Sequence, residues 1–201
     1  MEIIAMILVA ISAFVATNID DLFVLMLFFA AGKHEKNSIV IGQYLGFLSL
    51  VLISSTAYFL QFIVPSYFIS LLGIFPVLIG FKKLLDVKNH ENMEREGPAL
   101  KNDSSSGSWR NVFQVAVVTF TNGGDNLGVY APLFAGMETG QILIVSMLFM
   151  VMVGIWCILA SLMVGNRFLG NKIDKYGHII LPFVLIALGF MILAGGIMEF
   201  L

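Results

Sequence analysis

The sequence predicts an all-α membrane protein, with six transmembrane helices arranged as a 3+3 inverted repeat. Of its 201 residues, 59% are hydrophobic and 12% are charged, which would leave too much apolar surface in water for a soluble fold. Six apolar runs are long enough to cross a bilayer about 30 Å thick at about 1.5 Å per residue. A polar segment separates three runs from three, so the second set must enter the membrane from the opposite side.

Changes in polarity and turn residues bound the six predicted helices. The first run is too long for the apolar part of a signal peptide, and we expect it to remain as a mature helix. Pro65 and Ser66 separate the second and third runs, whereas Gly136 to Gly140 separate the fourth and fifth. The runs cover residues 3–31, 39–62, 66–86, 111–136, 141–164 and 178–200.

The chain divides into a first three-helix repeat, 1–86, a flexible linker, 87–109, and a second repeat, 110–201. The linker is rich in Asn, Glu, Gly and Ser, a composition that buries too little apolar surface to fold alone. Every basic residue lies in or around the connections after helices 1, 3 and 5, with Lys82 and Lys83 near the end of the third run. The positive-inside rule therefore places these connections in the cytoplasm and both termini outside. The basic residues are Lys33, Lys36, Lys82, Lys83, Lys88, Arg95, Lys101, Arg110, Arg167, Lys172 and Lys175.

Three aspartates lie deep within the predicted helices, out of thirteen acidic residues, and we expect no Lys or Arg beside them. A charged side chain at the centre of a membrane helix costs about 2.5 to 3.5 kcal/mol, so such residues are candidates for function. Carboxylate, amide and hydroxyl oxygens gather around them, and these are ligands for hard divalent cations. The predicted metal site comprises Thr17, Asn18, Asp20, Asp21, Thr121, Asn122, Asp125 and Asn126.

The polar centres of helices 1 and 4 correspond when the two halves are aligned, which superimposes Asp20 on Asp125. Gly123 and Gly124 weaken helix 4, and we expect helices 1 and 4 to be broken at mid-membrane, as in many transporters. Asp20 and Asp21 point about 100° apart on a regular helix, so one is expected to bind the ion and the other to support it. The alignment favours Asp20 and Asp125 as the ligands.

These features predict a secondary transporter rather than an enzyme. Neighbouring carboxylates in a low dielectric hold protons, which a divalent cation would displace, so we expect proton antiport and no cofactor besides the transported ion. The partners expected are the metal ion, protons and the lipid bilayer. A net charge of −2 gives no indication of nucleic acid binding, and two small inverted halves are compatible with a homodimer.

Three other functions fit the residues less well. An exporter of an organic cation, such as a basic amino acid, would pair an ammonium group with Asp125. A structural membrane subunit would use the same aspartates only for hydrogen bonds between helices. An intramembrane aspartyl protease also needs two aspartates, but Asn122 stands where its GxGD pattern requires the first glycine.

Two further features concern packing and softer ligands. Cys157 is the only cysteine, which excludes disulfides and CxxC centres and leaves one thiol as an auxiliary ligand. Gly42 and Gly46 form a GxxxG pattern, which predicts a close helix contact in helix 2.

The stretch TFTNGGDNLGVYAPLFA, Thr119 to Ala135, closely resembles the hallmark of the cadmium-resistance transporter (CadD-type) family. The segment from Thr17 to Leu22 resembles the first-helix motif of the same family. Length and the central linker also agree, so the resemblance extends over essentially the whole chain. It implies a bacterial inner-membrane efflux protein of the lysine-exporter (LysE) superfamily that acts on Cd²⁺. The resemblance also implies the residues of the substrate site, which are Asp20, Asp21, Asn122, Asp125 and Asn126. Their oxygen donors suit Mn²⁺, Ca²⁺ or Zn²⁺ at least as well as Cd²⁺.

Overall fold

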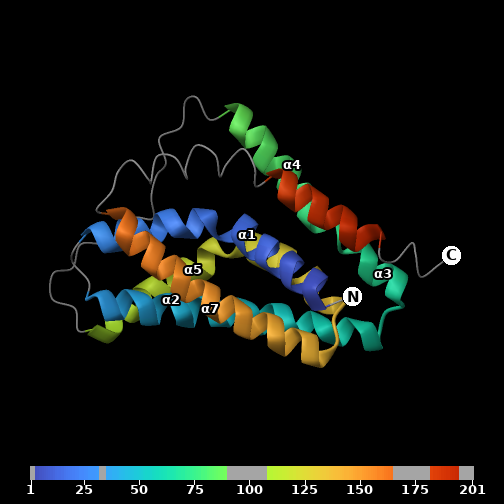
Figure 1. The fold of residues 1–201 in the computed structure, drawn as a ribbon, viewed down its shortest axis with the longest axis horizontal. Coiled ribbons are helices and arrows are strands. Elements are labelled where there is room, and N and C mark those ends of the chain that lie inside the picture. Colours follow the sequence, from blue (N-terminus) through green and yellow to red (C-terminus); the bar gives the residue numbers. More distant parts are fainter. Residues whose placement is uncertain (1–2, 32–34, 90–107, 165–181, 195–201) are drawn as a thin grey trace.

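The computed structural model describes residues 3–31, 35–89, 108–164 and 182–194, and in these ranges it contains helices and turns but no strand. The predicted all-helical class is therefore confirmed for the described part of the chain (Figure 1). The elements are α1 (Ile3–Ala31), α2 (Lys36–Ser55), the 3₁₀ helix η1 (Thr56–Phe62), α3 (Ser66–Leu71), α4 (Ile74–Asn89), α5 (Ser108–Asn122), α6 (Gly124–Ala135), α7 (Thr139–Val164) and a final helix, Pro182–Ala194.

Within the described ranges, four helical segments are long and apolar enough to cross a membrane: Ile3–Ala31, Lys36–Phe62, Phe68–Leu85 and Thr139–Val164. They match the first, second, third and fifth predicted runs. The sixth run is represented by the shorter apolar helix Pro182–Ala194, and its remaining residues lie outside the described ranges. The chain is thus a multi-pass membrane protein, whereas the six-span inverted repeat stays a prediction.

The fourth run is divided, as the glycines predict. Helix α5 ends at Asn122 and α6 begins at Gly124, with Gly123 as a turn between them. The expected break in helix 1 is wrong, because α1 continues without interruption past Asp20. It contains no Gly or Pro, and the side chains of Thr17 and Asn18 bond to carbonyls of their own helix. The polar centre of α1 is therefore accommodated without unwinding.

The ends of the predicted linker are helical. Helix α4 continues to Asn89, and α5 begins at Ser108, so the linker boundaries at 87 and 109 fall inside helices. Residues 90–107, the rest of that linker, lie outside the described ranges. Lys82 and Lys83 lie inside the regular helix α4, which matters for the site described below.

The helices form two groups (Figure 1). Helices α1, α2, α5 and α7 run along the long axis of the molecule, and α4 lies beside the 182–194 helix at one side. Glycines allow the close approach of the 182–194 helix to the start of α4, because a Cβ atom built on Gly73 would lie 2.6 Å from the Gly189 carbonyl oxygen.

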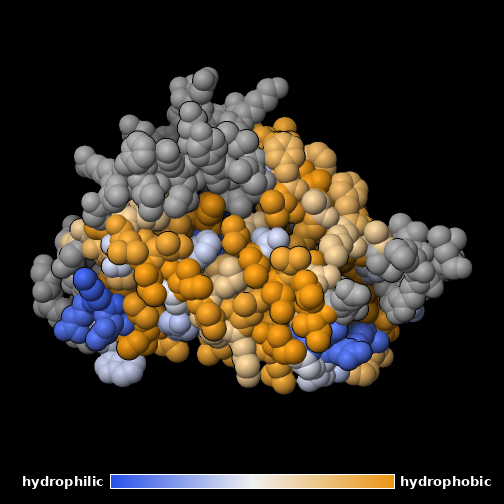
Figure 2. All heavy atoms as spheres, viewed as in Figure 1, coloured by the Kyte–Doolittle hydropathy of each residue, from blue (hydrophilic) through white to orange (hydrophobic). Residues whose placement is uncertain are grey.

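Figure 2 shows an apolar surface across the middle of the visible face and hydrophilic residues towards its two ends, as expected for a bilayer-embedded bundle.

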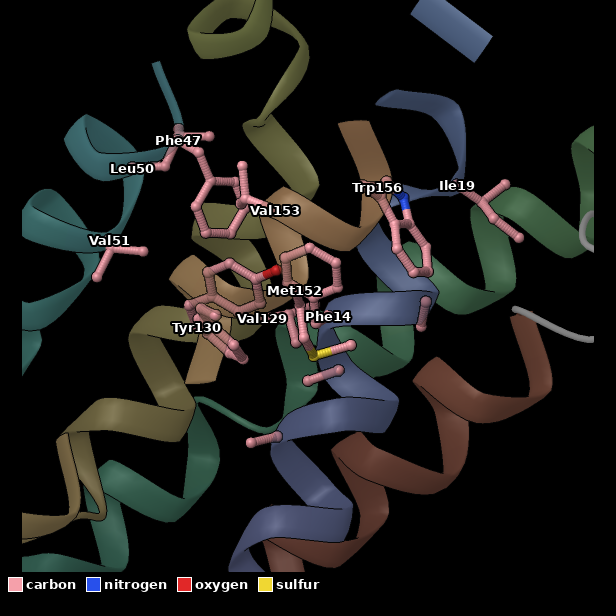
Figure 3. Close-up of a cluster of buried hydrophobic side chains, with 14 of the residues drawn as sticks. Phe14, Ile19, Phe47, Leu50, Val51, Val129, Tyr130, Met152, Val153 and Trp156 are labelled. Atoms are coloured by element: carbon pink, nitrogen blue, oxygen red, sulfur yellow. The ribbon is translucent and has the colours of Figure 1, made fainter. Parts of the chain in front are cut away.

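Aromatic rings from four helices fill the centre of the bundle (Figure 3). The Phe14 ring of α1 lies edge-on to Trp156 of α7 at 5.2 Å between centroids and 5.4 Å from Phe47 of α2. The Tyr130 ring of α6 is tilted by 36° to the Phe149 ring of α7, with 4.6 Å between centroids. These large side chains are buried, and they fix α1, α2, α6 and α7 around the polar residues described below.

The GxxxG contact of helix 2 is confirmed. A Cβ atom on Gly42 would lie 2.6 Å from the Val112 carbonyl oxygen, and one on Gly46 would lie 2.6 Å from the Ala116 carbonyl oxygen. Both neighbours belong to the backbone of α5, which cannot move aside as a side chain would. The two glycines therefore allow α2 and α5 to approach each other closely.

We expect Gly46→Ala to destabilise the protein by about 1 to 3 kcal/mol, the usual cost of an overpacked helix contact. The unfolding midpoint of the detergent-solubilised protein measures the effect. Gly140→Ala is the matched control, because a Cβ atom there meets nothing within 4 Å. Equal midpoints for the two variants would show that the α2–α5 contact is looser than described.

Candidate functional site

One lysine joins the two carboxylates that the internal alignment pairs. The Lys83 Nζ atom lies 2.8 Å from Asp20 Oδ2 and 2.8 Å from Asp125 Oδ2. These residues come from α4, α1 and α6, so the first and second halves of the chain each supply one carboxylate. All three side chains are only partly buried, with Asp20 the most exposed at 39%. The carboxylates therefore converge on a single cationic atom at a place that remains accessible.

The expectation that no Lys or Arg accompanies the aspartates is wrong. The charge pattern groups Lys83 with the basic residues around the connection after helix 3, whereas its ammonium contacts Asp20 and Asp125 from within the apolar segment Phe68–Leu85. Its position beside Leu84 and Leu85 was the available signal, because a charge on an apolar helix needs a partner. The sequence gives no indication of which carboxylates that partner would be.

The break in the fourth run positions Asp125. Because α6 starts at Gly124, Asp125 falls in the first turn of a helix, where the aligned peptide dipoles favour a negative charge. Its Oδ1 atom accepts a hydrogen bond from the Asn126 backbone N–H at 3.1 Å, which leaves Oδ2 for Lys83. The glycine turn thus orients one carboxylate oxygen towards the cation position.

Asp21 belongs to a different part of the site. It is buried at 3% exposure, and Gln43 of α2 donates a hydrogen bond from Nε2 to its Oδ2 atom. Thr119 of α5 donates to Gln43 Oε1 at 2.6 Å, which holds the amide with its N–H group towards the carboxylate. Asp21 Oδ1 has no hydrogen-bond partner among the described residues. This chain of hydrogen bonds links α1, α2 and α5.

A second polar network surrounds the Tyr130 hydroxyl. That oxygen lies 2.9 Å from Thr17 Oγ1 and accepts a hydrogen bond from Asn18 Nδ2 at 2.7 Å. Asn126 Nδ2 donates to Asn18 Oδ1 at 3.4 Å, and Trp156 Nε1 donates to the Asn18 carbonyl at 2.8 Å. Thr17, Asn18 and Asn126 are therefore brought together, but mainly to join α1, α6 and α7. The Asn126 Oδ1 atom is buried without a partner among the described residues.

The remaining predicted ligands are less central. Thr121 is exposed, and its hydroxyl bonds the Val117 carbonyl of its own helix at 2.9 Å. Asn122 is also exposed and lies near Asp21. Cys157 is a buried free thiol of α7. In the described part of the chain, no three His, Cys, Asp or Glu side chains are close enough to hold a metal ion by themselves.

Sequence reasoning missed Lys83, Gln43 and Thr119. Gln43 is a buried amide one residue from Gly42, on the face of α2 that contacts α5. The position of Gln43 beside a GxxxG glycine could have indicated this role, because a polar side chain buried at a helix contact needs a hydrogen-bond partner. Thr119 stands out in the sequence as one of the hydroxyl oxygens near Asp125, but its bond to Gln43 is not predictable from the local pattern.

We expect Gln43→Leu to lower the free energy of unfolding by about 1 to 3 kcal/mol, because it removes a hydrogen-bond donor from a buried carboxylate. The effect is to be measured by denaturant unfolding in detergent. Ser49→Ala on the same helix is the control, since the Ser49 hydroxyl bonds only a carbonyl of α2 and is exposed. Coupling to Asp21→Leu in a double-mutant cycle checks the cause. Additive effects would contradict a Gln43–Asp21 interaction.

Comparison with known proteins identifies the family. The family model described as "Cadmium resistance transporter" matches residues 14–200, nearly the whole chain. No curated protein and no solved structure matches the sequence. The matched range includes both carboxylates that contact Lys83, Lys83 itself and the Gly123 turn. The chain therefore belongs to the cadmium resistance transporter family.

Proposed function

We propose that the protein exports divalent metal ions, Cd²⁺ foremost, in exchange for protons, and that the ion binds between Asp20 and Asp125. One observation carries this proposal: both carboxylates lie 2.8 Å from the same cationic atom, although they come from opposite halves of the chain. Two carboxylates that already converge on one positive charge could also bind a metal ion there, with the shorter oxygen contacts that a metal makes. The family supports metal as the substrate.

A neighbouring amide is a candidate for a third ligand. Asn126 follows Asp125, and its Oδ1 atom is buried without a described hydrogen-bond partner. Asp21, which faces Gln43 of α2, would support the site and not bind the ion directly. Carboxylate and amide oxygens bind Mn²⁺, Ca²⁺ and Zn²⁺ well, so resistance to Cd²⁺ does not require selectivity for it. The charged ligands in this proposal number two, which accords with the absence of a larger acidic cluster in the described residues.

Proton exchange would supply the driving force. Export of a divalent ion against an interior-negative potential costs about 4.6 kcal/mol at 100 mV, twice the cost for one elementary charge. Protons that replace the metal on the carboxylates outside would neutralise the site while it returns to the inner side, where they would leave before the next ion binds; two protons for one divalent ion would be electroneutral. In this proposal the protein lies in a bacterial inner membrane, with the linker in the cytoplasm and both termini outside.

An organic cation is the second candidate, and one observation favours it. The group that lies between Asp20 and Asp125 is itself a primary ammonium, and the ammonium of a basic amino acid would pair with the same two carboxylates. Competition distinguishes the two substrates. Free lysine would lower Cd²⁺ transport if both ions shared the site and would leave it unchanged if the site takes only metal.

We expect Asp125→Asn to lower Cd²⁺ affinity by about tenfold or more, since one charge-assisted contact contributes about 1.5 to 3 kcal/mol. The assay is Cd²⁺ uptake into inverted proteoliposomes with lumenal pH recorded simultaneously. The native protein should accumulate Cd²⁺ and release protons. Glu138→Gln, the same chemical change at an exposed carboxylate, is the control and should transport normally. Full transport by Asp125→Asn would refute this location for the ion.

A further inference from the structure

We propose that Lys83 competes with the transported cation. Its ammonium occupies the ion position when no ion is bound, and an ion that binds displaces it. This inference rests on the proposed function, because it takes the space between Asp20 and Asp125 as the ion position. It assigns a role to a residue that neither the sequence pattern nor the family resemblance singles out. The argument depends on where the ammonium lies, what it compensates and where it can move.

The ammonium lies where a bound cation would lie. Lys83 Nζ is 2.8 Å from one oxygen of Asp20 and 2.8 Å from one oxygen of Asp125. Both distances are those of short charge-assisted hydrogen bonds. A metal ion that used the same two oxygens could not bind while the ammonium remained between them. Binding of the ion therefore requires that Lys83 leave.

The ammonium also compensates charge in the empty site. Without it, two carboxylates on apolar helices would face each other without a counter-ion, which is strongly destabilising in a low dielectric. With it, the site carries less uncompensated charge between two transport events. Binding of an ion breaks the contacts of Lys83 with Asp20 and Asp125 before the ion forms its own contacts. The lysine therefore weakens the apparent affinity for the ion. A moderate affinity favours release on the other side.

The displaced lysine has a path to a polar environment. Lys83 lies two residues before the end of the apolar segment Phe68–Leu85, and its side chain is 22% exposed. Its long aliphatic stem can follow the helix while the ammonium reaches the polar end, as lysines near the ends of membrane helices do. Lys82, the neighbouring residue, is already exposed. Displacement thus needs no loss of the lysine charge.

Cd²⁺ binding to the purified full-length protein in detergent, measured by titration calorimetry, tests the proposal. The Lys83→Gln variant should bind Cd²⁺ at least about tenfold more tightly than the native protein, because the ion no longer competes with two charge-assisted contacts. Lys83→Arg, which keeps the charge, should not show this gain. Lys82→Gln makes the same change of net charge at an exposed position and should bind as the native protein does. Equal or weaker binding by Lys83→Gln relative to Lys82→Gln overturns the proposal.

A second measurement uses the native protein, so it does not depend on the folding of a variant. Acylation of lysines by an amine-reactive reagent is followed by mass spectrometry, with and without saturating Cd²⁺. Labelling of Lys83 should rise several-fold when Cd²⁺ displaces its ammonium, whereas labelling of Lys82 should stay constant. Unchanged or lower labelling of Lys83 at saturation overturns the proposal.

The two proposals fail differently. If native protein binds and transports Cd²⁺ and Asp125→Asn abolishes this, but Lys83→Gln gives no gain in affinity, the competitor role is wrong and the export function stands. If native protein shows no saturable Cd²⁺ binding, the proposed function fails and the role of Lys83 fails with it.

Discussion

Charge compensation between helices is the constraint on which the rest of the arrangement depends. A carboxylate on an apolar helix needs a counter-ion or hydrogen-bond donors, and two carboxylates facing each other need a cation. The Lys83 ammonium, 2.8 Å from both Asp20 and Asp125, meets this need across three helices. Its contacts hold α4 to α1 and α6, in addition to the apolar contact between Ile79 and Gly128. Exchange of the ammonium for an ion would therefore alter how α4 attaches to the bundle.

Helix α1 contributes residues to each of the three polar groups of the described site. Its adjacent aspartates point in different directions, so Asp20 meets α4 and α6 whereas Asp21 meets Gln43 of α2. One turn earlier, Thr17 and Asn18 contact the Tyr130 hydroxyl of α6. A regular helix produces this division, because successive residues are rotated by about 100°. The continuity of α1 is thus what allows one segment to serve the ion position and the packing of its neighbours together.

The sequence predicts most of the helices, but only part of the site. Apolar length locates four spans, Gly123 and Gly124 predict the break before α6, and the internal alignment pairs Asp20 with Asp125. Local pattern does not reveal which distant helix supplies a partner, so it predicts neither the contact of Lys83 with the two carboxylates nor that of Gln43 with Asp21. The expected break in α1 is wrong because polar residues do not by themselves unwind a helix: Thr17 and Asn18 bond to carbonyls of α1.

Crystals of the protein grown with Cd²⁺ and measured at a wavelength where cadmium scatters anomalously test the central claim most directly. The account predicts an anomalous peak between Asp20 Oδ2 and Asp125 Oδ2, with the Lys83 ammonium turned away from both. A peak beside Cys157 with Lys83 still joining the two carboxylates would contradict it, because the ion would then bind without using the position that the lysine occupies.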